Sequence, residues 1–429
     1  MVITEVLHVI FEYLDDYRDW VSASSVCQRW RQVATSNQLW LPLLRRYNIT
    51  ESDGDGGVMK VFAAMAKKYP GALDEYAIVS RAVKHLQMVN PSVCATTENN
   101  MPYVQLFQAS LTRPGLWQPT WHTSSREEKM LMMLYHLFTD TAAVDMQLCC
   151  AACFGFFVCY NDVYALHLKR RLTVDVLPLY TQQFDTLVGF AWAPGMDEGL
   201  GLVLQGELAG HVVRYGKALR TAHRMGPIWM NDIPYQDLGP FETWLSTFAA
   251  NIQGGVRRVL RANDEILAPS GFLEVGPGVG SVTTHGINVH VSTLFLLNMA
   301  RVAYRITFTF MRAACKYSSV QLVRRHWIFR YTNGQAAEVD GDGVVGFYPT
   351  LSATNPHFSY CSYSDGGVVR EELGTLARAT LENCVTSLQG WFQFVPGSLT
   401  HPEGPELQVT IPFVQFVLPM SARPRIYNE

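Results

Sequence analysis

Residues 301–310 alternate strictly between apolar and polar side chains. The apolar positions are Val302, Tyr304, Ile306, Phe308 and Phe310. Because successive side chains of a strand point to opposite sides of a sheet, this period of two predicts a strand with one buried face. Residues 287–291 alternate in the same way, and turn signals such as Asn333-Gly334 separate further apolar runs. Short strands joined by glycine turns favour a β-sandwich, which we predict over residues 275–420.

One segment inside this region has a helical period. Its apolar side chains are three to five residues apart: Leu373, Leu376, Leu381, Cys384 and Leu388. This spacing predicts a helical insertion over residues 369–388, with a disordered loop as the alternative.

The first 48 residues also have a helical period. Apolar stripes run through Ile3, Val6, Leu7, Ile10, Phe11 and Leu14, then through Val26, Cys27, Trp30, Val33 and Ala34, and end at Leu39 and Trp40. They predict three short helices. A unit of about 40 residues seldom buries enough apolar surface to fold alone, so part of these stripes should face a partner.

The middle of the chain mixes both periods. We predict a helical linker region over residues 49–98 and an α+β domain over residues 99–262. Within that domain, Ser125 can cap a helix that starts at Arg126, and residues 241–259 form a further amphipathic helix.

Length and composition exclude several classes of protein. A chain of 429 residues suits about three domains. A net charge of −3 lacks the basic excess of most nucleic-acid-binding proteins. The start of the chain has no positive region followed by an apolar core, and the longest uncharged run, 146–161, falls short of a membrane span of about 18 residues. We expect a protein of the cytoplasm, the nucleus or both, with no membrane partner.

Two glycine clusters could in principle bind a nucleotide. Residues 276–280 (Gly-Pro-Gly-Val-Gly) mimic the cofactor loop of methyltransferases, and residues 341–346 (Gly-Asp-Gly-Val-Val-Gly) match GxGxxG. Both loops should precede a helix, but β-branched residues follow the first and Phe347-Tyr348-Pro349 follow the second. We therefore interpret the first as a hinge and the second as a β-loop in which glycine supplies a positive φ.

Metal and nucleophile motifs are weaker still. Cys149, Cys150, Cys153 and Cys159 contain one CxxC in an apolar run, which fits small buried side chains better than zinc ligands. The chain has neither HExxH nor GxSxG. We predict a non-catalytic protein without metal or cofactor.

Residues 3–40 resemble an F-box. The resemblance is carried by the first stripe, the Val26-Cys27-Gln28-Arg29-Trp30-Arg31 block and the Leu39-Trp40 ending. It implies docking on the Skp adaptor of SCF ubiquitin ligases, and through the adaptor on a cullin and a RING subunit. The implied adaptor-binding residues are Ile3, Leu7, Ile10, Phe11, Leu14, Val26, Cys27, Trp30, Leu39 and Trp40.

The region from 275 to 420 resembles the ApaG domain. Matching segments are 289–293, Arg325-His326-Trp327-Ile328, 338–346, Gly390-Trp391-Phe392 and 409–413. The resemblance implies a fibronectin type III-like sandwich. An F-box and an ApaG domain in one chain imply a SUKH-like domain between them, where residues 157–162 would be a strand and turn and residues 241–248 a closing helix.

These resemblances favour a substrate-recognition subunit of an SCF-type ligase, in which the SUKH-like and ApaG domains bind an unknown target protein. The alternatives are a non-degradative structural or assembly protein and a methyltransferase that uses residues 276–280. For the target we predict a docking loop made of His326, Trp327, Gly341, Gly343 and Gly346, since aromatic anchors dominate interfaces and glycine N–H groups suit an anion. The alternative is that Trp327 belongs to the core and that the glycines only turn the chain.

Overall fold

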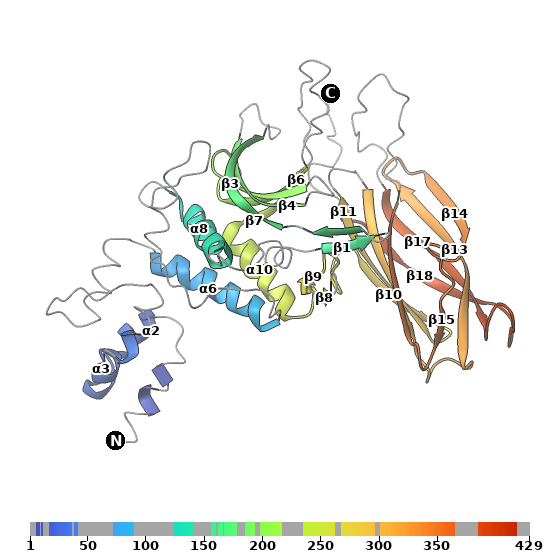
Figure 1. Ribbon diagram of the computed structural model, residues 1–429, viewed down its shortest axis with the longest axis horizontal. Coiled ribbons are helices and arrows are strands. Elements are labelled where there is room, and N and C mark those ends of the chain that lie inside the picture. Colours follow the sequence, from blue (N-terminus) through green and yellow to red (C-terminus); the bar gives the residue numbers. More distant parts are fainter. Residues whose placement is uncertain are drawn as a thin grey trace, which may run out of the picture.

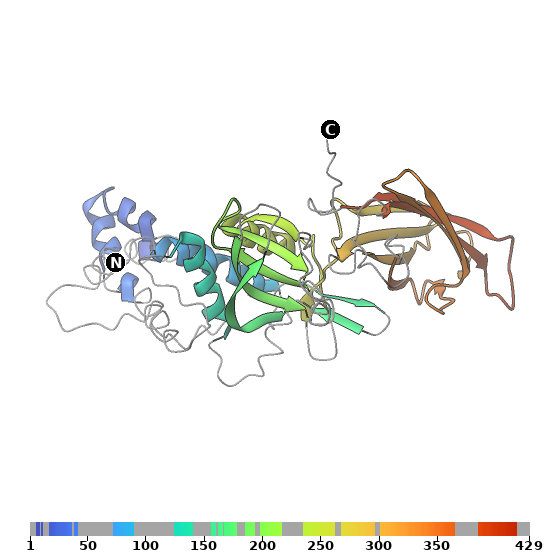
Figure 2. The same cartoon turned by 90° about the horizontal axis from the view of Figure 1, so that it is seen from above.

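The computed structural model describes residues 6–8, 10–11, 17–36, 38–41, 72–89, 124–139, 156–159, 162–165, 167–177, 185–193, 198–216, 235–261, 267–296, 301–364 and 385–417. Its helices are α2 (Tyr17–Ala23), α3 (Gln28–Ala34), α6 (Ala72–Val89), α8 (Arg126–Thr139) and α10 (Phe241–Gln253). The N-terminal helices lie at one end of the molecule and a β-sandwich lies at the other (Figures 1 and 2).

Two antiparallel sheets form the sandwich. One has the order β10 (Val279–Thr284), β11 (Ile287–Leu296), β12 (Arg301–Phe310), β16 (His357–Tyr363). The other has the order β14 (Ala336–Asp342), β13 (Ser319–Tyr331), β17 (Val385–Pro396), β18 (Leu407–Gln415), and β15 (Thr350–Ser352) also pairs with β13. The predicted sandwich is confirmed, and the alternating segment 301–310 is β12.

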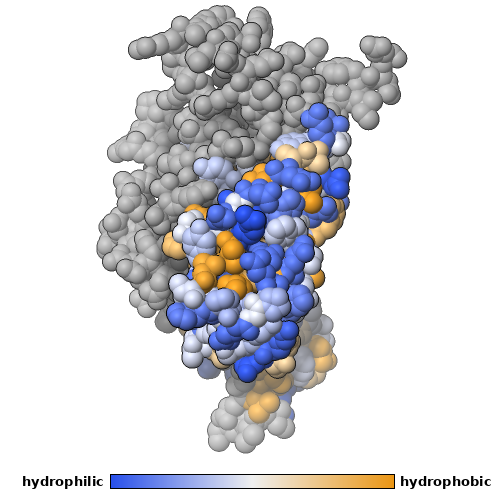
Figure 3. All heavy atoms as spheres, turned by 90° about the vertical axis from the view of Figure 1, so that its right-hand side faces the viewer, coloured by the Kyte–Doolittle hydropathy of each residue, from blue (hydrophilic) through white to orange (hydrophobic). Residues whose placement is uncertain are grey.

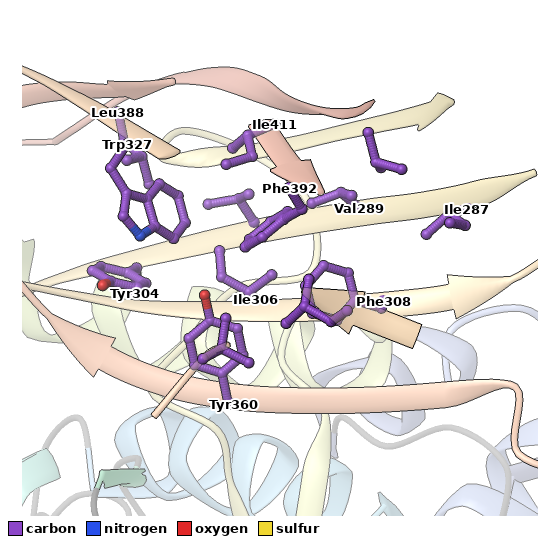
Figure 4. Close-up of a cluster of buried hydrophobic side chains, with 14 of the residues drawn as sticks. Ile287, Val289, Tyr304, Ile306, Phe308, Trp327, Tyr360, Leu388, Phe392 and Ile411 are labelled. Carbon is purple, nitrogen blue, oxygen red and sulfur yellow. The ribbon is translucent and has the colours of Figure 1, made fainter. Parts of the chain in front are cut away.

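The sandwich core lies between the inner faces of the two sheets. Phe308 from β12 meets Phe392 from β17 edge-on, with ring centroids 4.7 Å apart, and the apolar residues of the alternating segment share this core (Figure 4). Every second side chain of β12 is buried between the sheets, as the alternation predicts. Ala303 and Arg305 on the other face are buried as well, so the prediction of a single buried face fails in the first half of the strand.

The middle of the chain is an α+β unit. Five antiparallel strands pair in chain order: β3 (His167–Leu177), β4 (Asp185–Ala193), β5 (Glu198–Val203), β6 (His211–Gly216) and β7 (Tyr235–Pro240). Helices α6, α8 and α10 share one apolar core with β4, β5 and β6. Helix α6, which the sequence assigns to a linker region, therefore packs into this unit.

Local signals set the ends of two helices. Ser125 caps α8 through its hydroxyl, which accepts from the Glu128 N–H at 3.2 Å, while Glu128 accepts from the Ser125 N–H at 2.6 Å. Helix α10 ends at Gln253 rather than at residue 259, because Gly254 and Gly255 follow and Gly255 has a φ of +70°. The prediction for residues 254–259 is therefore wrong.

Two short hairpins complete the described chain. Strand β1 (Phe156–Cys159) pairs with β2 (Asp162–Ala165), which confirms the strand expected there, while residues 160–161 lie outside the described part of the chain. Strand β8 (Val259–Arg261) pairs with β9 (Leu267–Pro269).

The predicted helical insertion is wrong at its end. Residues 385–388 begin β17, and Leu388 is fully buried in the sandwich core. Residues 365–384 lie outside the described part of the chain, so the rest of the insertion stays a prediction. Leu388 matched a helical period by chance, because apolar residues four apart occur in strands as well.

The glycine segment 276–280 does not form a nucleotide-binding loop. It leads into β10, a strand, and β10 turns directly into β11 at His285-Gly286. The carbonyl of Gly278 accepts hydrogen bonds from the backbone N–H of Thr293 at 3.0 Å and from its hydroxyl at 2.9 Å. These bonds hold the segment against β11, so it is neither a methyltransferase loop nor a free hinge.

The middle unit and the sandwich are joined by a shared core. Phe272, Leu296 and Ala303 belong to the same buried cluster as helices α6, α8 and α10. Beside them, the Glu274 carboxylate contacts Arg305 at 2.5 Å and Arg258 at 3.3 Å. The two units are thus fixed to each other by packed apolar surface and ion pairs.

A half-buried arginine, Arg257, lies at this junction. Burial, with a smaller effect of nearby Arg214, lowers the pKa of Arg257 to about 10. Its guanidinium still donates to the carbonyls of Ser270 and Gly271, at 2.9 and 3.1 Å. These two bonds tie the end of the helical layer to the segment that enters the sandwich.

Candidate protein-docking surfaces

The N-terminal helices have a filled core of their own. Leu7, Phe11, Leu39 and Trp40 are all less than 7% exposed. The Trp40 ring meets the Trp20 ring edge-on at 5.3 Å. Trp20 lies on α2, a helix that the apolar stripes did not reveal. Four of the predicted adaptor-binding residues therefore hold this unit together, and their side chains do not form its surface.

A second group of N-terminal apolar side chains is exposed. Val6, Ile10, Val21 and Val26 are 51%, 44%, 52% and 63% exposed. Val6 and Ile10 are one helical turn apart and so lie on the same side of the first helix. Val26 lies in the turn between α2 and α3, three residues after α2 ends at Ala23. We call these four residues the N-terminal apolar patch.

The predicted adaptor-binding residues thus differ in their exposure to solvent. Ile10, Val26 and Cys27 are exposed, and Trp30 is half-buried against Phe11, with ring centroids 5.6 Å apart. Ile3 and Leu14 lie outside the described residues. Val6 and Val21 were not predicted to contact the adaptor. Val6 belongs to the first apolar stripe, and Val21 lies on α2, which the stripes do not reveal.

Trp327 is a core residue of the sandwich. Its side chain is 1% exposed and packs between Tyr304 and Phe392, each with ring centroids 5.4 Å away (Figure 4). The expectation that Trp327 anchors a target is therefore wrong. Strand alternation explains this position, because Trp327 is on the inner face of β13 and its neighbour His326 is on the outer face.

His326 lies on the outer face of the second sheet. Its Nδ1 is 2.9 Å from an Asp340 carboxylate oxygen on β14, and its ring stacks on Trp391 of β17. The three residues form a row across three neighbouring strands, because His326 pairs in register with both Asp340 and Trp391.

The 341–346 loop is closed on itself. The Gly343 N–H donates to the Val323 carbonyl at 2.8 Å, and the Val344 N–H donates to the Phe347 carbonyl at 2.9 Å. These two N–H groups are therefore not free to bind an anion. Gly343 and Gly346 have φ values of +58° and +78°, which confirms their predicted conformational role.

Arg325 occupies the space that the loop leaves open. Its guanidinium donates to the carbonyls of Asp342 and Gly343, at 3.0 and 2.7 Å. A Cβ at Gly341 would lie 2.7 Å from this guanidinium, so glycine there makes room for Arg325. The glycine motif thus binds an arginine of its own chain.

The exposed aromatic side chains of this loop are Phe347 and Tyr348, at 57% and 43% exposure. Phe347 also contacts Phe358 of β16, with ring centroids 6.1 Å apart. Two adjacent aromatic residues directly after a glycine-rich turn are the sequence signal that indicates this exposed surface. Apolar surface interrupts the hydrophilic exterior of the molecule at its sandwich end (Figure 3).

Other kinds of site are not apparent in the described residues. They contain no cluster of three or more histidine, cysteine or acidic side chains suited to a metal ion. None of the described helices is long and apolar enough to cross a bilayer. Cys149, Cys150 and Cys153 lie outside the described residues, and of Cys159 only the backbone in β1 is described.

Two family models match the chain, ApaG domain over residues 301–374 and F-box-like over residues 4–46. F-box protein SKIP16 of Arabidopsis thaliana is 30% identical over 189 residues, which are 41% of this chain and 39% of that protein. F-box only protein 3 of Homo sapiens is 31% identical over 119 residues, 26% of this chain and 24% of that protein. The matches to these two relatives thus span well under half of their length.

A third relative is compared over most of its length. Protein ApaG of Pseudomonas paraeruginosa is 33% identical over 101 residues, which are 22% of this chain and 75% of that protein. The described residues matched by the ApaG model, 301–364, lie within the sandwich, and the residues matched by the F-box model include the N-terminal helices. The chain belongs to the ApaG family and is an F-box protein with a C-terminal ApaG domain, related to F-box only protein 3 and SKIP16.

Proposed function

We propose that this chain is the substrate-recognition subunit of an SCF-type E3 ubiquitin ligase. The F-box docks on a Skp-type adaptor, which links it to a cullin and a RING subunit. The middle unit, which we assign as a SUKH-like domain, and the ApaG sandwich bind the target protein. The chain itself has no catalytic role, and the ligase acts in the cytoplasm, the nucleus or both.

The N-terminal apolar patch carries this proposal. Its four side chains are uncovered although the F-box core beneath them is filled by Phe11 and Trp40. Burial of apolar surface is worth about 25 cal/mol per Å², so covering side chains of this size yields several kcal/mol. Single exposed apolar residues are common on proteins, so the proposal rests on four of them within one small helical unit, two of which, Val6 and Ile10, share one side of the first helix.

The junction between the middle unit and the sandwich supports separate binding sites for the target and the adaptor. Phe272 and Ala303 are buried in the core that joins the two units, so a target bound to the sandwich is held rigidly relative to the middle unit. The F-box helices lie at the opposite end of the molecule (Figure 2). Adaptor and target can therefore bind at the same time without touching.

Co-purification from cells tests the proposal. The unmodified chain should recover the adaptor, a cullin and a RING subunit together. The double variant Ile10→Asp/Val26→Asp should recover none of them, because two carboxylates would be buried in the adaptor interface. The matched control Leu399→Asp, which alters an apolar side chain 46% exposed on the sandwich, should recover all three.

Two results would contradict the proposal. Adaptor recovery that is unchanged by Ile10→Asp/Val26→Asp would show that the patch is not the docking face. Adaptor recovery without a cullin would favour a non-degradative assembly protein.

A further inference from the structure

Strand β14 is an open edge of the ApaG sandwich. Among the strands that the structure describes, it pairs only with β13, and Figure 1 shows it at the outer margin of the molecule. Its pairing runs without a bulge from Ala336 to Asp342, and it contains no proline. Short length, bulges, proline and charged side chains are common devices that keep such an edge from pairing with another chain, and of these β14 has only charged side chains, all of them acidic.

The register shows which backbone groups of β14 are open. Just before β14 begins, the Tyr331 N–H of β13 donates to the Gln335 carbonyl, and just after β14 ends, the Gly343 N–H donates to the Val323 carbonyl of β13. In an antiparallel ladder, bonded and non-bonded pairs alternate. The odd-numbered residues of β14 therefore bond to β13, and the residues that direct their N–H and C=O groups to the open side are Ala336, Glu338 and Asp340.

The same open residues carry negative charge. Glu338, Asp340 and Asp342 share the outer face of β14, and the side chains of Asp340 and Asp342 are 63% and 68% exposed. Asp340 and Asp342 each have a basic neighbour on β13, whereas Glu338 pairs in register with Ile328. Glu338 has no ion pair within the described residues.

The inner side of this edge is apolar. Val339 pairs in register with the buried Trp327 but is itself 41% exposed, because it lies at the margin of the core. A further strand placed beside β14 would thus meet carboxylates on one face and an apolar side chain on the other.

We propose that β14 binds an extended basic segment of a partner protein by strand addition. Residues opposite Glu338 and Asp340 are lysine or arginine, and the residue between them is apolar and covers Val339. Main-chain hydrogen bonds to the open groups supply affinity, and the alternating side chains supply specificity. This deepens the proposed function, and it rests on that function only for the identification of the bound segment as part of the target.

The acidic side chains of β14 also make pairing with β14 of a second copy of this chain unfavourable. Two β14 strands side by side would place carboxylates near carboxylates, which is unfavourable across a strand pair. A basic strand gains from the same positions. We therefore choose a basic partner segment over self-association.

Fluorescence anisotropy of the full chain tests this assignment. The probe is a labelled peptide of about nine residues with alternating lysine and valine, long enough to span the edge. Two comparison peptides have the same composition with the lysines clustered at one end, or glutamate in place of lysine. The alternating peptide should bind at least about tenfold more tightly than either.

Three variants distinguish the contribution of backbone hydrogen bonds to peptide binding from the contribution of charge. Glu338→Pro removes an N–H that points to the open side and keeps the pairing with β13, so it should weaken binding at least about tenfold while the melting temperature is retained. Glu338→Gln removes only the charge and should weaken binding about threefold to fivefold, an effect that disappears at about 1 M salt. The control Glu403→Gln, at an exposed acidic residue outside β14, should bind like the unmodified chain.

Several results would overturn the proposal that β14 binds a basic strand. Equal binding of the alternating and clustered peptides, or full binding by a folded Glu338→Pro variant, would reduce the effect to general charge attraction and overturn the proposal. Peptide-free dimers that Glu338→Pro abolishes would show that β14 pairs with a second copy instead. If Glu338→Pro fails to fold, Glu338→Lys must abolish binding of the lysine peptide, and retention of binding would overturn the proposal.

The strand-addition proposal and the proposed ligase function can fail independently of each other. Glu338→Pro should still recover the adaptor and the cullin, because β14 is remote from the F-box (Figure 2). Peptide binding without cullin recovery would leave strand addition intact and remove the ligase assignment. Cullin recovery without peptide binding would do the reverse.

Discussion

The Trp391 indole lies nearly parallel to the His326 imidazole, with ring centroids 5.0 Å apart and 15° between the ring planes. His326 is also held by Asp340 on the opposite side, so the stack is fixed from two neighbouring strands. Stacked aromatic pairs are worth about 0.5–1.5 kcal/mol beyond the area that they bury.

The first prediction concerns the stack of His326 on Trp391. A double-mutant cycle with Trp391→Leu and His326→Gln should give a coupling energy of about 0.5–1.5 kcal/mol, measured by denaturant unfolding. The pair Trp391→Leu and Gln408→Ala, in which Gln408 is an exposed residue of β18, should give additive changes. Additive changes for both pairs would mean that the stack contributes nothing.

Leu7 and Ile10 should differ sharply although both belong to one predicted stripe. Leu7 is 6% exposed and Ile10 is 44% exposed. Leu7→Ala should lower the free energy of unfolding of the F-box by about 2–4 kcal/mol, because it leaves a cavity. Ile10→Ala should change that free energy by less than about 0.5 kcal/mol and should weaken adaptor binding instead. Thermal unfolding and adaptor titration of the two variants check this, and equal loss of stability would place Ile10 in the core.

Gly343 and Gly346 make a matched pair in the loop of the ApaG domain. A Cβ at Gly343 would lie 2.6 Å from the Phe347 carbonyl oxygen, whereas nothing lies within 4 Å of a Cβ at Gly346. Gly346→Ala should cost about 1 kcal/mol, since only its positive φ is strained, and Gly343→Ala should cost clearly more. Gly343→Val should therefore lower the melting temperature as well. Similar melting temperatures for the two alanine variants would contradict this account.

Strand periodicity was the most reliable signal in the sequence. Val302, Ile306 and Phe308 alternate with polar residues because β12 has one face in the sandwich core, and the register follows from that burial alone. The Asn333-Gly334 turn between β13 and β14 was equally readable, since Gly334 has a φ of +82°. Local chemistry decides such features, so a single sequence suffices.

Which apolar residue is exposed and which is buried could not be predicted in the same way. Leu7 and Ile10 are chemically alike, and only the packing of α2 and α3 decides which one is buried. Trp327 and Trp391 are both tryptophans in the ApaG region, yet one is in the core and the other stacks on the outer face. The phase of each strand relative to the core is a tertiary property, and an error of one residue exchanges core and surface.

The last prediction concerns Glu75, a buried carboxylate between helices of the middle unit. Its side chain is 7% exposed and lies 3.6 Å from Arg126, which also contacts Glu242 at the start of α10. Burial raises the pKa of Glu75 above its ordinary value, and Lys129 and Arg126 oppose this only in part. The folded chain therefore holds this proton more tightly than the unfolded chain does. The stabilising contribution of the protonated group is complete below the unfolded pKa and is lost as the pH rises through the folded pKa.

Glu75→Gln, which stays neutral, should accordingly raise the melting temperature at pH 7 and should give no gain near pH 4. Thermal unfolding across this range checks the prediction, with Glu207→Gln, at an exposed carboxylate of the middle unit, as the control. A melting temperature that Glu75→Gln lowers at pH 7 would show that the ion pair with Arg126 outweighs the cost of burial.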